Sequence, residues 1–156
     1  MQDPTDLRRF EARQEDFARA LGEIESGRKR SHWMWYVFPQ VAGLGNSEMS
    51  RQYAISSVTE AESFLLHPSL GPAYRQIVDA VWEQVVDRGE TIRALFGSPD
   101  DAKLVSSLTL FAAIAKRLLT PSADIVEFIT HAEEILEAAY AQGLDRCTRT
   151  EQFFLR

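Results

Sequence analysis

Apolar residues recur at intervals of three and four along most of the chain, which is the spacing of one face of an α-helix. A first helix is predicted between an N-cap at Thr5 or Asp6 and a stop at Gly27. Its inward positions are Phe10, Phe17, Leu21 and Ile24. The same spacing predicts further helices over residues 47–55, 59–66, 69–86, 91–96, 98–115 and 120–143. The pattern indicates an all-α fold, an irregular helical bundle in a single domain of residues 1–156.

Capping residues mark the beginnings of several of these helices. Thr59 and Glu62 form a capping box, in which each side chain accepts a hydrogen bond from a backbone amide of the first turn. Ser98-Pro99-Asp100-Asp101 combines a serine N-cap, a proline at the first helical position and two acids at the positive end of the helix dipole. Thr120-Pro121 repeats this start signal. His67-Pro68 ends a helix, because proline disfavours helical backbone in the residue before it.

One stretch departs from helical spacing: residues 29–40 (KRSHWMWYVFPQ), called the aromatic segment below. Two tryptophans, a tyrosine, a phenylalanine, a histidine and a basic pair occupy these positions. The alternation of Trp33, Trp35 and Val37 suits either a short strand or a buried extended loop. No second strand candidate follows, so a loop is predicted.

Composition excludes several classes of protein. The 156 residues carry a net charge of -6, which repels phosphate, so binding to nucleic acid or to an anionic membrane is not expected. A single cysteine, Cys147, rules out an intrachain disulfide and a cysteine zinc site, and fits a reducing compartment. No apolar run approaches the ~20 residues of a membrane span, and the N-terminus lacks a signal-peptide pattern. The expected location is the cytoplasm.

The aromatic segment combines side chains that suit a pocket for a flat or anionic ligand. Trp33 and Trp35 offer stacking faces, and Lys29 and Arg30 offer positive charge. His32, if buried against indole, would have a lowered pKa and would serve as a base or a hydrogen-bond partner. The alternative is an ordinary core role, with the histidine held by a backbone carbonyl and the tryptophans acting as anchors.

Two further stretches contribute candidates. Residues 43–47 (GLGNS) lead into a helix start where backbone amides can approach a phosphate, although a plain turn with a serine cap explains them equally well. On the helix from Ser98, the side chains of Asp100, Lys103 and Ser107 lie within ~60° of arc beside the apolar stripe, so this polar strip can border a cleft. A surface Asp100–Lys103 ion pair with a bystander serine is the simpler interpretation.

The sequence thus predicts a site between residues 29–47 and the 98–111 helix. Its candidate reacting groups are His32, Asp100, Lys103 and Ser107. Its candidate ligand contacts are Lys29, Arg30, Ser31, Trp33, Trp35, Gln40, Gly43, Gly45, Ser47, Tyr53, Ser106 and Thr109. No metal and no cofactor is predicted, because neither His67 nor His131 shows a ligating spacing, and His131 is expected on a solvated helix face.

Several stretches resemble the bacterial family called domain of unknown function 1810, whose members are often labelled "calpastatin". The resemblance covers roughly residues 7 to 150 and implies a mainly α-helical domain with no established activity. Calpastatin-like inhibitors are disordered and proline-rich, unlike this apolar chain, so the label is discounted. The matching stretches include residues 29–40, Gly43-Leu44-Gly45, Tyr53-Ala54-Ile55, His67-Pro68 and Phe96-Gly97-Ser98-Pro99-Asp100.

A second resemblance is to the NADAR superfamily, in the order of an aromatic motif and a later lysine-bearing helix. That superfamily acts on N-glycosidic bonds of ADP-ribose-type compounds, so the resemblance implies hydrolysis of such a bond. The chain departs from the pattern, because residues 50–53 (SRQY) lack the acidic residue that follows the superfamily's aromatic motif. Glu48 and Glu60 flank this stretch and offer a carboxylate from either side.

The leading hypothesis is therefore a protein that binds a nucleotide-like or other anionic aromatic ligand. If it is an enzyme, the expected reaction is hydrolysis or transfer at an N-glycosidic bond. One rival is a noncatalytic interaction module or homodimer whose aromatic segment contacts the partner. The other rival is that the aromatic segment only fills the core.

Overall fold

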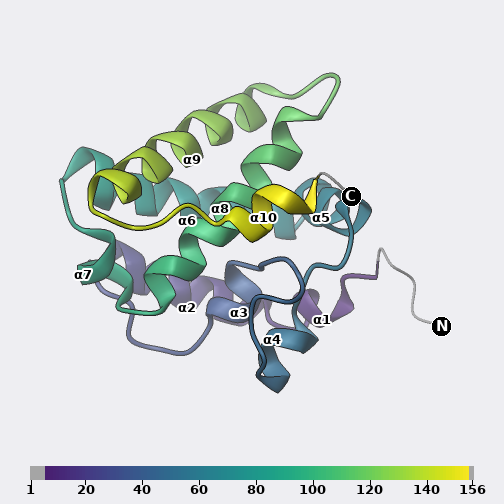
Figure 1. Ribbon diagram of the computed structural model, residues 1–156, viewed down its shortest axis with the longest axis horizontal. Coiled ribbons are helices and arrows are strands. Elements are labelled where there is room, and N and C mark those ends of the chain that lie inside the picture. Colours follow the sequence, from purple (N-terminus) through teal and green to yellow (C-terminus); the bar gives the residue numbers. More distant parts are fainter. Residues whose placement is uncertain (1–5, 155–156) are drawn as a thin grey trace.

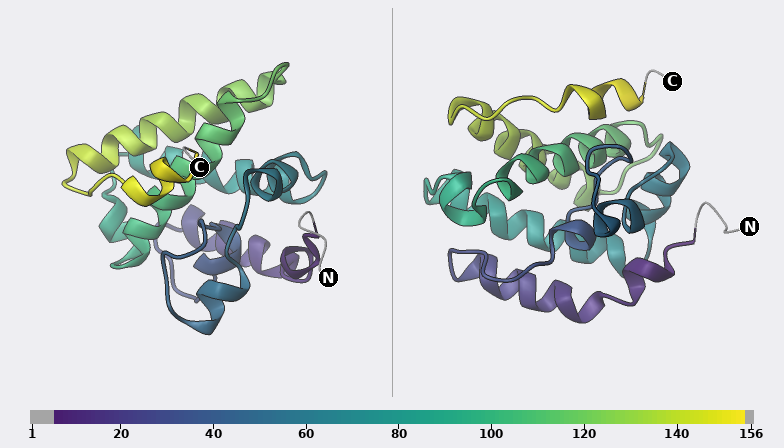
Figure 2. Two further views of the ribbon diagram at one scale, coloured as in Figure 1. Left: turned by 45° about the vertical axis from the view of Figure 1, so that its right-hand side comes forward. Right: turned by 60° about the horizontal axis from the view of Figure 1, so that its bottom comes forward.

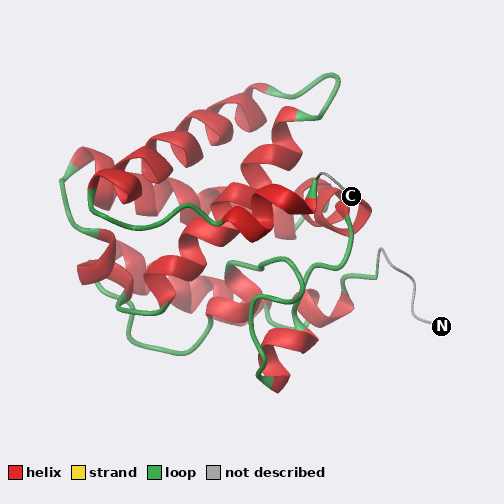
Figure 3. Cartoon of the chain, viewed as in Figure 1, coloured by secondary structure: helices red, strands yellow, loops and turns green. Residues whose placement is uncertain are grey.

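The computed structural model describes residues 6–154 and confirms the all-α fold (Figure 1, Figure 3). The predicted cap at Thr5 lies outside these residues. Within them, no helix is both long enough and apolar enough to cross a membrane. The described helices are α1 (Arg8–Glu11), α2 (Gln14–Glu25), α3 (Met34–Val37), α4 (Glu48–Gln52), α5 (Val58–Leu66), α6 (Leu70–Trp82) with its π-helical extension η1 (Glu83–Asp87), α7 (Ile92–Phe96), α8 (Asp100–Lys116), α9 (Ala123–Ala141) and α10 (Thr148–Phe153).

Helices α6 and α8 form the centre of the molecule (Figure 2). Helix α6 packs against α2 and α9, and α5 lies against both α6 and α8. Helix α8 also contacts α7, α9 and α10, so the C-terminal helix covers the same central helix. The buried side chains of these elements form one continuous hydrophobic core.

The central position of α8 follows from its composition. Apolar residues occur all round this helix rather than along one stripe, and Leu108, Leu110 and Phe111 are all fully buried. Ser106 and Ser107 are buried among them. A helix that is apolar on every side must be surrounded by other elements, as α8 is.

The aromatic segment contains the one-turn helix α3, which corrects the predicted extended loop. The backbone amide of Val37 donates to the carbonyl of Trp33 over 3.1 Å. Trp33, Met34, Tyr36 and Val37 are buried, which is a helical spacing. The alternation of Trp33, Trp35 and Val37 was misleading because Met34 and Tyr36, which lie between them, are also buried.

After α3 the chain pairs briefly with the segment that follows α4. Ile55 donates its backbone N–H to the carbonyl of Gln40 over 2.8 Å, and Ala42 donates to the carbonyl of Ile55 over 2.9 Å. These bonds make an isolated parallel bridge between Val41 and Ile55. The bridge closes residues 40–55 into a loop that contains α4.

The N-cap of α1 is Leu7 rather than the predicted Asp6, and three later helices also begin at residues other than the predicted ones. Ser57, not Thr59, caps α5, and Ser122, not Thr120, caps α9. Helix α8 begins two residues after Ser98, with no side-chain cap. Each predicted signal lies within two residues of the observed start, because neighbouring residues that can cap a helix compete and tertiary packing selects among them.

The predicted first helix is divided into α1 and α2 at Ala12 and Arg13. The Nε of Arg13 donates to the hydroxyl of Tyr53 over 2.9 Å. Its guanidinium also lies 5.0 Å from the ring centre of Tyr36 and 5.8 Å from that of Tyr53. The break therefore lies where the N-terminal helices are joined to the aromatic segment and to the end of α4.

Candidate functional site

A pocket of about 270 Å³ lies where the aromatic segment and the loop of residues 40–54 meet the first turns of α8. It joins the two parts of the chain that the sequence predicts to face each other. Six candidate ligand contacts or reacting groups line it: Trp35, Gln40, Gly45, Tyr53, Lys103 and Ser106. The other lining residues, for which the sequence gave no chemical signal, are Val41, Leu44, Ser50, Ala54, Pro99 and Ala102.

Trp35 and Lys103 face each other across this pocket. The ammonium nitrogen of Lys103 lies 5.4 Å from the centre of the half-buried Trp35 ring, within the range of a cation–π contact. Lys103 also pairs with Asp100 at 3.5 Å, and the other oxygen of Asp100 lies 2.8 Å from the ammonium of Lys29. One carboxylate therefore serves two ammonium groups, which leaves the cluster with a net positive charge.

The remaining lining residues shape the pocket. Gly45 allows the loop to approach α4 closely, because a Cβ at this position would collide with the hydroxyl of Ser50. Ser106 Oγ donates to the carbonyl of Ala102 over 3.2 Å, as a hydroxyl does inside a helix. Tyr53 is held by its bond from Arg13. The ammonium group of Lys103 is thus surrounded by apolar side chains and by side chains that carry hydroxyl groups.

Glu23 of α2 organises the beginning of the aromatic segment, a role that the sequence did not reveal. Its Oε1 accepts bonds from the backbone amides of Arg30 and Ser31, at 2.7 and 2.9 Å, and from the indole N–H of Trp33 at 2.9 Å. Its Oε2 accepts a bond from the Ser31 hydroxyl at 2.6 Å. Burial alone would raise the pKa of Glu23, but these four bonds outweigh it and lower the pKa to about 2.

Trp33 and Lys29 consequently belong to the core rather than to the pocket. Trp33 is buried and packs edge-on against Phe96, with ring centres 6.3 Å apart. The ammonium of Lys29 donates to the carbonyl of Ser31 over 2.6 Å, and its side chain is 7% exposed. Paired with Asp100, this lysine ties the aromatic segment to the start of α8.

Two candidate reacting groups, His32 and Ser107, do not line the pocket. His32 is exposed, so the expected burial against indole is wrong. Ser107 is fully buried, and its hydroxyl shares a 2.9 Å hydrogen bond with the hydroxyl of Tyr74, whose pKa is raised by burial. The helical spacing correctly predicted that Ser107 lies near Lys103. It did not reveal that the Ser107 side chain is buried in the core.

Four other candidates lie outside the pocket lining. Ser47 caps α4, and the Thr109 hydroxyl donates to a backbone carbonyl of α8. The exposed Arg30 is held only through its backbone amide. Gly43 has a positive φ of 93°, and a Cβ there would collide with the guanidinium of Arg149 from α10. Arg149, for which the sequence gave no signal, therefore adds a cation beside the glycine turn that leads into the pocket.

The chemical groups that line the pocket are apolar side chains, hydroxyls, an amide and one ammonium group. None of the described residues that line it is a histidine, a cysteine or a carboxylate. Asp100 is close through Lys103, but it does not line the pocket, and both of its oxygens are paired with lysine ammonium groups. A group of side chains with metal-ligating atoms, Asp79, Glu127 and His131, shares no residue with this pocket.

Comparisons with known proteins agree with the fold. A family model described as "Protein of unknown function (DUF1810)" matches residues 4–138. The chain is similar to a solved structure, that of the conserved hypothetical protein Rv1873 from Mycobacterium tuberculosis, with 40% identity, 95% of each chain covered and a TM-score of 0.77. The search of curated proteins finds no match. Neither description states an activity, so function must be argued from the geometry of the site.

Proposed function

The chain belongs to the DUF1810 family of proteins of unknown function. We propose that it binds a small planar anion in the pocket lined by Trp35 and Lys103. A nucleotide base with an anionic substituent is the representative ligand. The ring would lie against Trp35 and the negative charge beside Lys103.

The observation that carries this proposal is the pairing of an indole face with an ammonium group in one concave site. Lys103 already lies over the Trp35 ring, and the cluster of Lys29, Asp100 and Lys103 has one more positive than negative charge. None of the described side chains that line the pocket is a carboxylate. An apolar cleft with a few convergent polar groups is the usual form of a small-molecule site.

The size of the pocket limits the ligand. At about 270 Å³ it lies just below the roughly 300–1,000 Å³ of sites for drug-sized molecules. One ring system with a compact charged group fits this space, whereas the remainder of a dinucleotide would extend along the surface. An exposed cation, Arg149, lies beside Gly43, which precedes the lining residues Leu44 and Gly45.

Hydrolysis of an N-glycosidic bond stays a prediction. Glycoside hydrolases typically use two carboxylates that flank the scissile bond. Glu60, one of the two acids considered for this role, is buried and pairs with Arg9 at 3.2 Å. Glu48 is exposed at the first turn of α4 and does not line the pocket. Binding is therefore the function that the geometry supports.

The rival interpretation, a partner-binding surface or homodimer seam, has less support. Most apolar side chains of the aromatic segment are buried within the same chain, including Trp33, Met34, Val37 and Phe38. Among the apolar side chains of the aromatic segment, only that of Trp35 is partly exposed. A binding hot spot would need aromatic anchors that remain free for the partner.

Calorimetric titration with AMP, ADP-ribose and uncharged adenosine tests the proposal. Wild-type protein should bind the anions more tightly than adenosine. Lys103→Gln should weaken anion binding about tenfold, because it removes the charge beside the ring. Trp35→Leu should weaken all three ligands, since it removes the stacking face.

Lys116→Gln is the matched control. Lys116 lies at the end of the same helix, is half-exposed and pairs with Glu133 at 2.9 Å, but it does not line the pocket. Its replacement should leave binding unchanged. Equal affinity of the wild type and both pocket variants for every ligand, or equal loss in Lys116→Gln, would overturn the proposal.

A further inference from the structure

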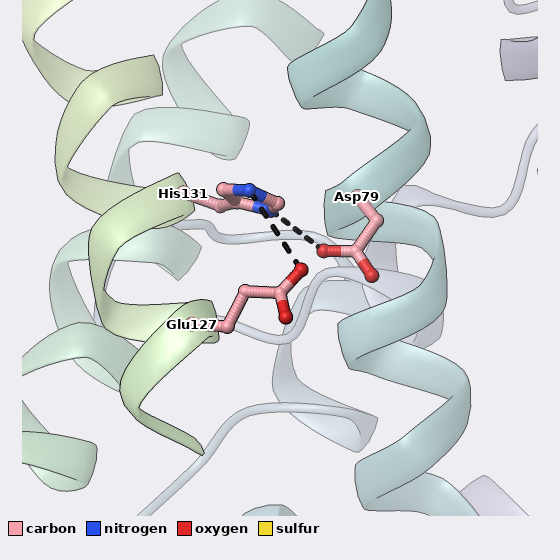
Figure 4. Close-up of side chains that lie close together, drawn as sticks. All are labelled: Asp79, Glu127 and His131. Carbon is pink, nitrogen blue, oxygen red and sulfur yellow. Dashed lines mark hydrogen bonds and ion pairs between the residues drawn. The ribbon is translucent and has the colours of Figure 1, made fainter. Parts of the chain in front are cut away.

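A second group of polar side chains lies between α6 and α9, where Asp79 faces Glu127 and His131 (Figure 4). His131 Nδ1 lies 2.8 Å from Asp79 Oδ1, and His131 Nε2 lies 3.9 Å from Glu127 Oε1. One ligating atom from each residue falls within 4.8 Å of the others. The imidazole is 16% exposed, whereas the two carboxylates are about half-exposed.

The imidazole is held in one orientation. Its ring stacks on Trp82 with a centroid distance of 4.5 Å and an interplanar angle of 17°. At 2.8 Å from a carboxylate oxygen, Nδ1 must carry the proton and donate it. In the neutral ring, Nε2 then holds a lone pair, which faces the Glu127 carboxylate. Two electron-rich groups face each other there, an arrangement that a shared cation stabilises.

His67 shows what a fully satisfied histidine looks like in the same molecule. Its Nδ1 accepts bonds from the backbone amides of Ser69 and Leu70, both at 3.0 Å, so the proton resides on Nε2. That N–H faces Glu11 Oε1 at 3.3 Å. Both ring nitrogens of His67 are thus engaged, whereas the Nε2 lone pair of a neutral His131 ring has no hydrogen-bond donor among the described residues.

The charge around His131 also favours a cation. Within the described chain, Asp79 and Glu127 pair with no lysine or arginine, and their one charged partner is His131. Asp124 lines the adjacent groove together with both acids. Arg75 lines that groove too, but its guanidinium lies beside Gly71. Among the described residues, the two carboxylates that contact His131 thus lack a lysine or arginine counter-ion.

We infer that His131 Nε2 and the Glu127 carboxylate bind a divalent transition-metal ion, with Asp79 orienting the imidazole from its other nitrogen. Zinc–nitrogen and zinc–oxygen bonds of about 2.0–2.2 Å require the two donor atoms to be roughly 3.4 Å apart in a tetrahedral site. The observed 3.9 Å closes to this value with a small movement of the exposed Glu127 side chain. Water would complete the coordination.

The ligand set selects the class of metal. An imidazole with a carboxylate suits Zn²⁺ and its neighbours in the first transition row, whereas Mg²⁺ and Ca²⁺ prefer oxygen ligands alone. A carboxylate bonded to the other nitrogen of a metal-binding histidine is a common supporting contact. Asp79 occupies that position.

Calorimetric titration of the full chain with ZnCl₂ and MgCl₂ tests this site. The wild type should bind one Zn²⁺ per chain and show no heat with Mg²⁺. His131→Gln should abolish this zinc binding, and Glu127→Gln, which changes an exposed side chain, should weaken it at least tenfold. Zinc should also move the side-chain nitrogen resonances of His131 in NMR spectra.

The controls are the other groups that can bind zinc. His67→Gln, His32→Gln and Cys147→Ser should each retain the wild-type zinc affinity. Absence of zinc binding in the wild type would overturn the inference, and would instead fit a protonated His131 that bridges both carboxylates. Undiminished binding in His131→Gln or in Glu127→Gln would overturn it equally.

Discussion

Trp33 and Trp35 are two residues apart, yet they belong to different environments. Trp33 is buried, with its indole N–H bonded to Glu23, whereas Trp35 is half-buried beside Lys103 in the pocket. Two residues along a helix correspond to a turn of about 200°, so the start of α3 directs these side chains to opposite faces. The comparison shows that a dense aromatic stretch can supply both a core residue and a wall of a surface pocket.

Trp33→Ala should have the largest effect on this comparison. Loss of a fully buried indole removes its packing and leaves a cavity, so the free energy of unfolding should fall by about 3–5 kcal/mol. Urea denaturation measures this change. Trp33→Phe keeps part of the packing but loses the hydrogen bond to Glu23. Its free energy of unfolding should lie between those of the wild type and Trp33→Ala. A loss below about 1 kcal/mol would place Trp33 outside the core.

Glu23→Gln should have the next largest effect, about 2–3 kcal/mol at neutral pH, because four donors lose a charged acceptor. The folded pKa of Glu23, about 2, is below its ordinary value of 4.5. Its stabilisation is therefore present above about pH 4.5 and declines as the pH falls toward 2. The difference in Tm between wild type and variant should shrink over that range.

Glu25→Gln serves as the matched control for this pH dependence. Glu25 ends the same helix and is exposed. Its replacement should alter Tm little at any pH. A Tm difference between wild type and Glu23→Gln that stays constant from pH 6 to pH 3 would contradict the low pKa of Glu23.

Trp35→Ala should have the smallest effect on stability, about 1–2 kcal/mol, since this indole is half-buried and its contact with Lys103 contributes only modestly. The same urea titration measures it beside Trp33→Ala. A loss as large as that of Trp33→Ala would erase the distinction between core and pocket tryptophans.

Much of the fold could be predicted because its signals are local. The stops at Gly27, Gly97 and Gly143 all coincide with positive φ values, which glycine adopts most readily. Ser47 caps α4 as predicted. Spacing failed in the aromatic segment, because buried residues on several sides of α3 produced a pattern that resembles alternation.

The sequence predicted several residues that line the candidate pocket, but it did not predict how deeply individual side chains are buried. The sequence placed Trp35 and Lys103 in one site, and both line the pocket. It could not show that Ser107 is fully buried, since depth depends on the helices that surround α8. Glu23 looked like an ordinary helix acid, because its donors lie seven to ten residues later in the chain.

The two walls of the pocket differ in how they are anchored. Lys103 and Ser106 stand on α8, which is surrounded by other helices, whereas α4 on the opposite wall has no buried residue. Backbone amides of α8 should therefore exchange with deuterium only when the whole molecule unfolds, and those of α4 should exchange through local opening. A ligand in the pocket would hold the weakly anchored wall in place, and would reveal itself by slower exchange of the α4 amides than in the free protein.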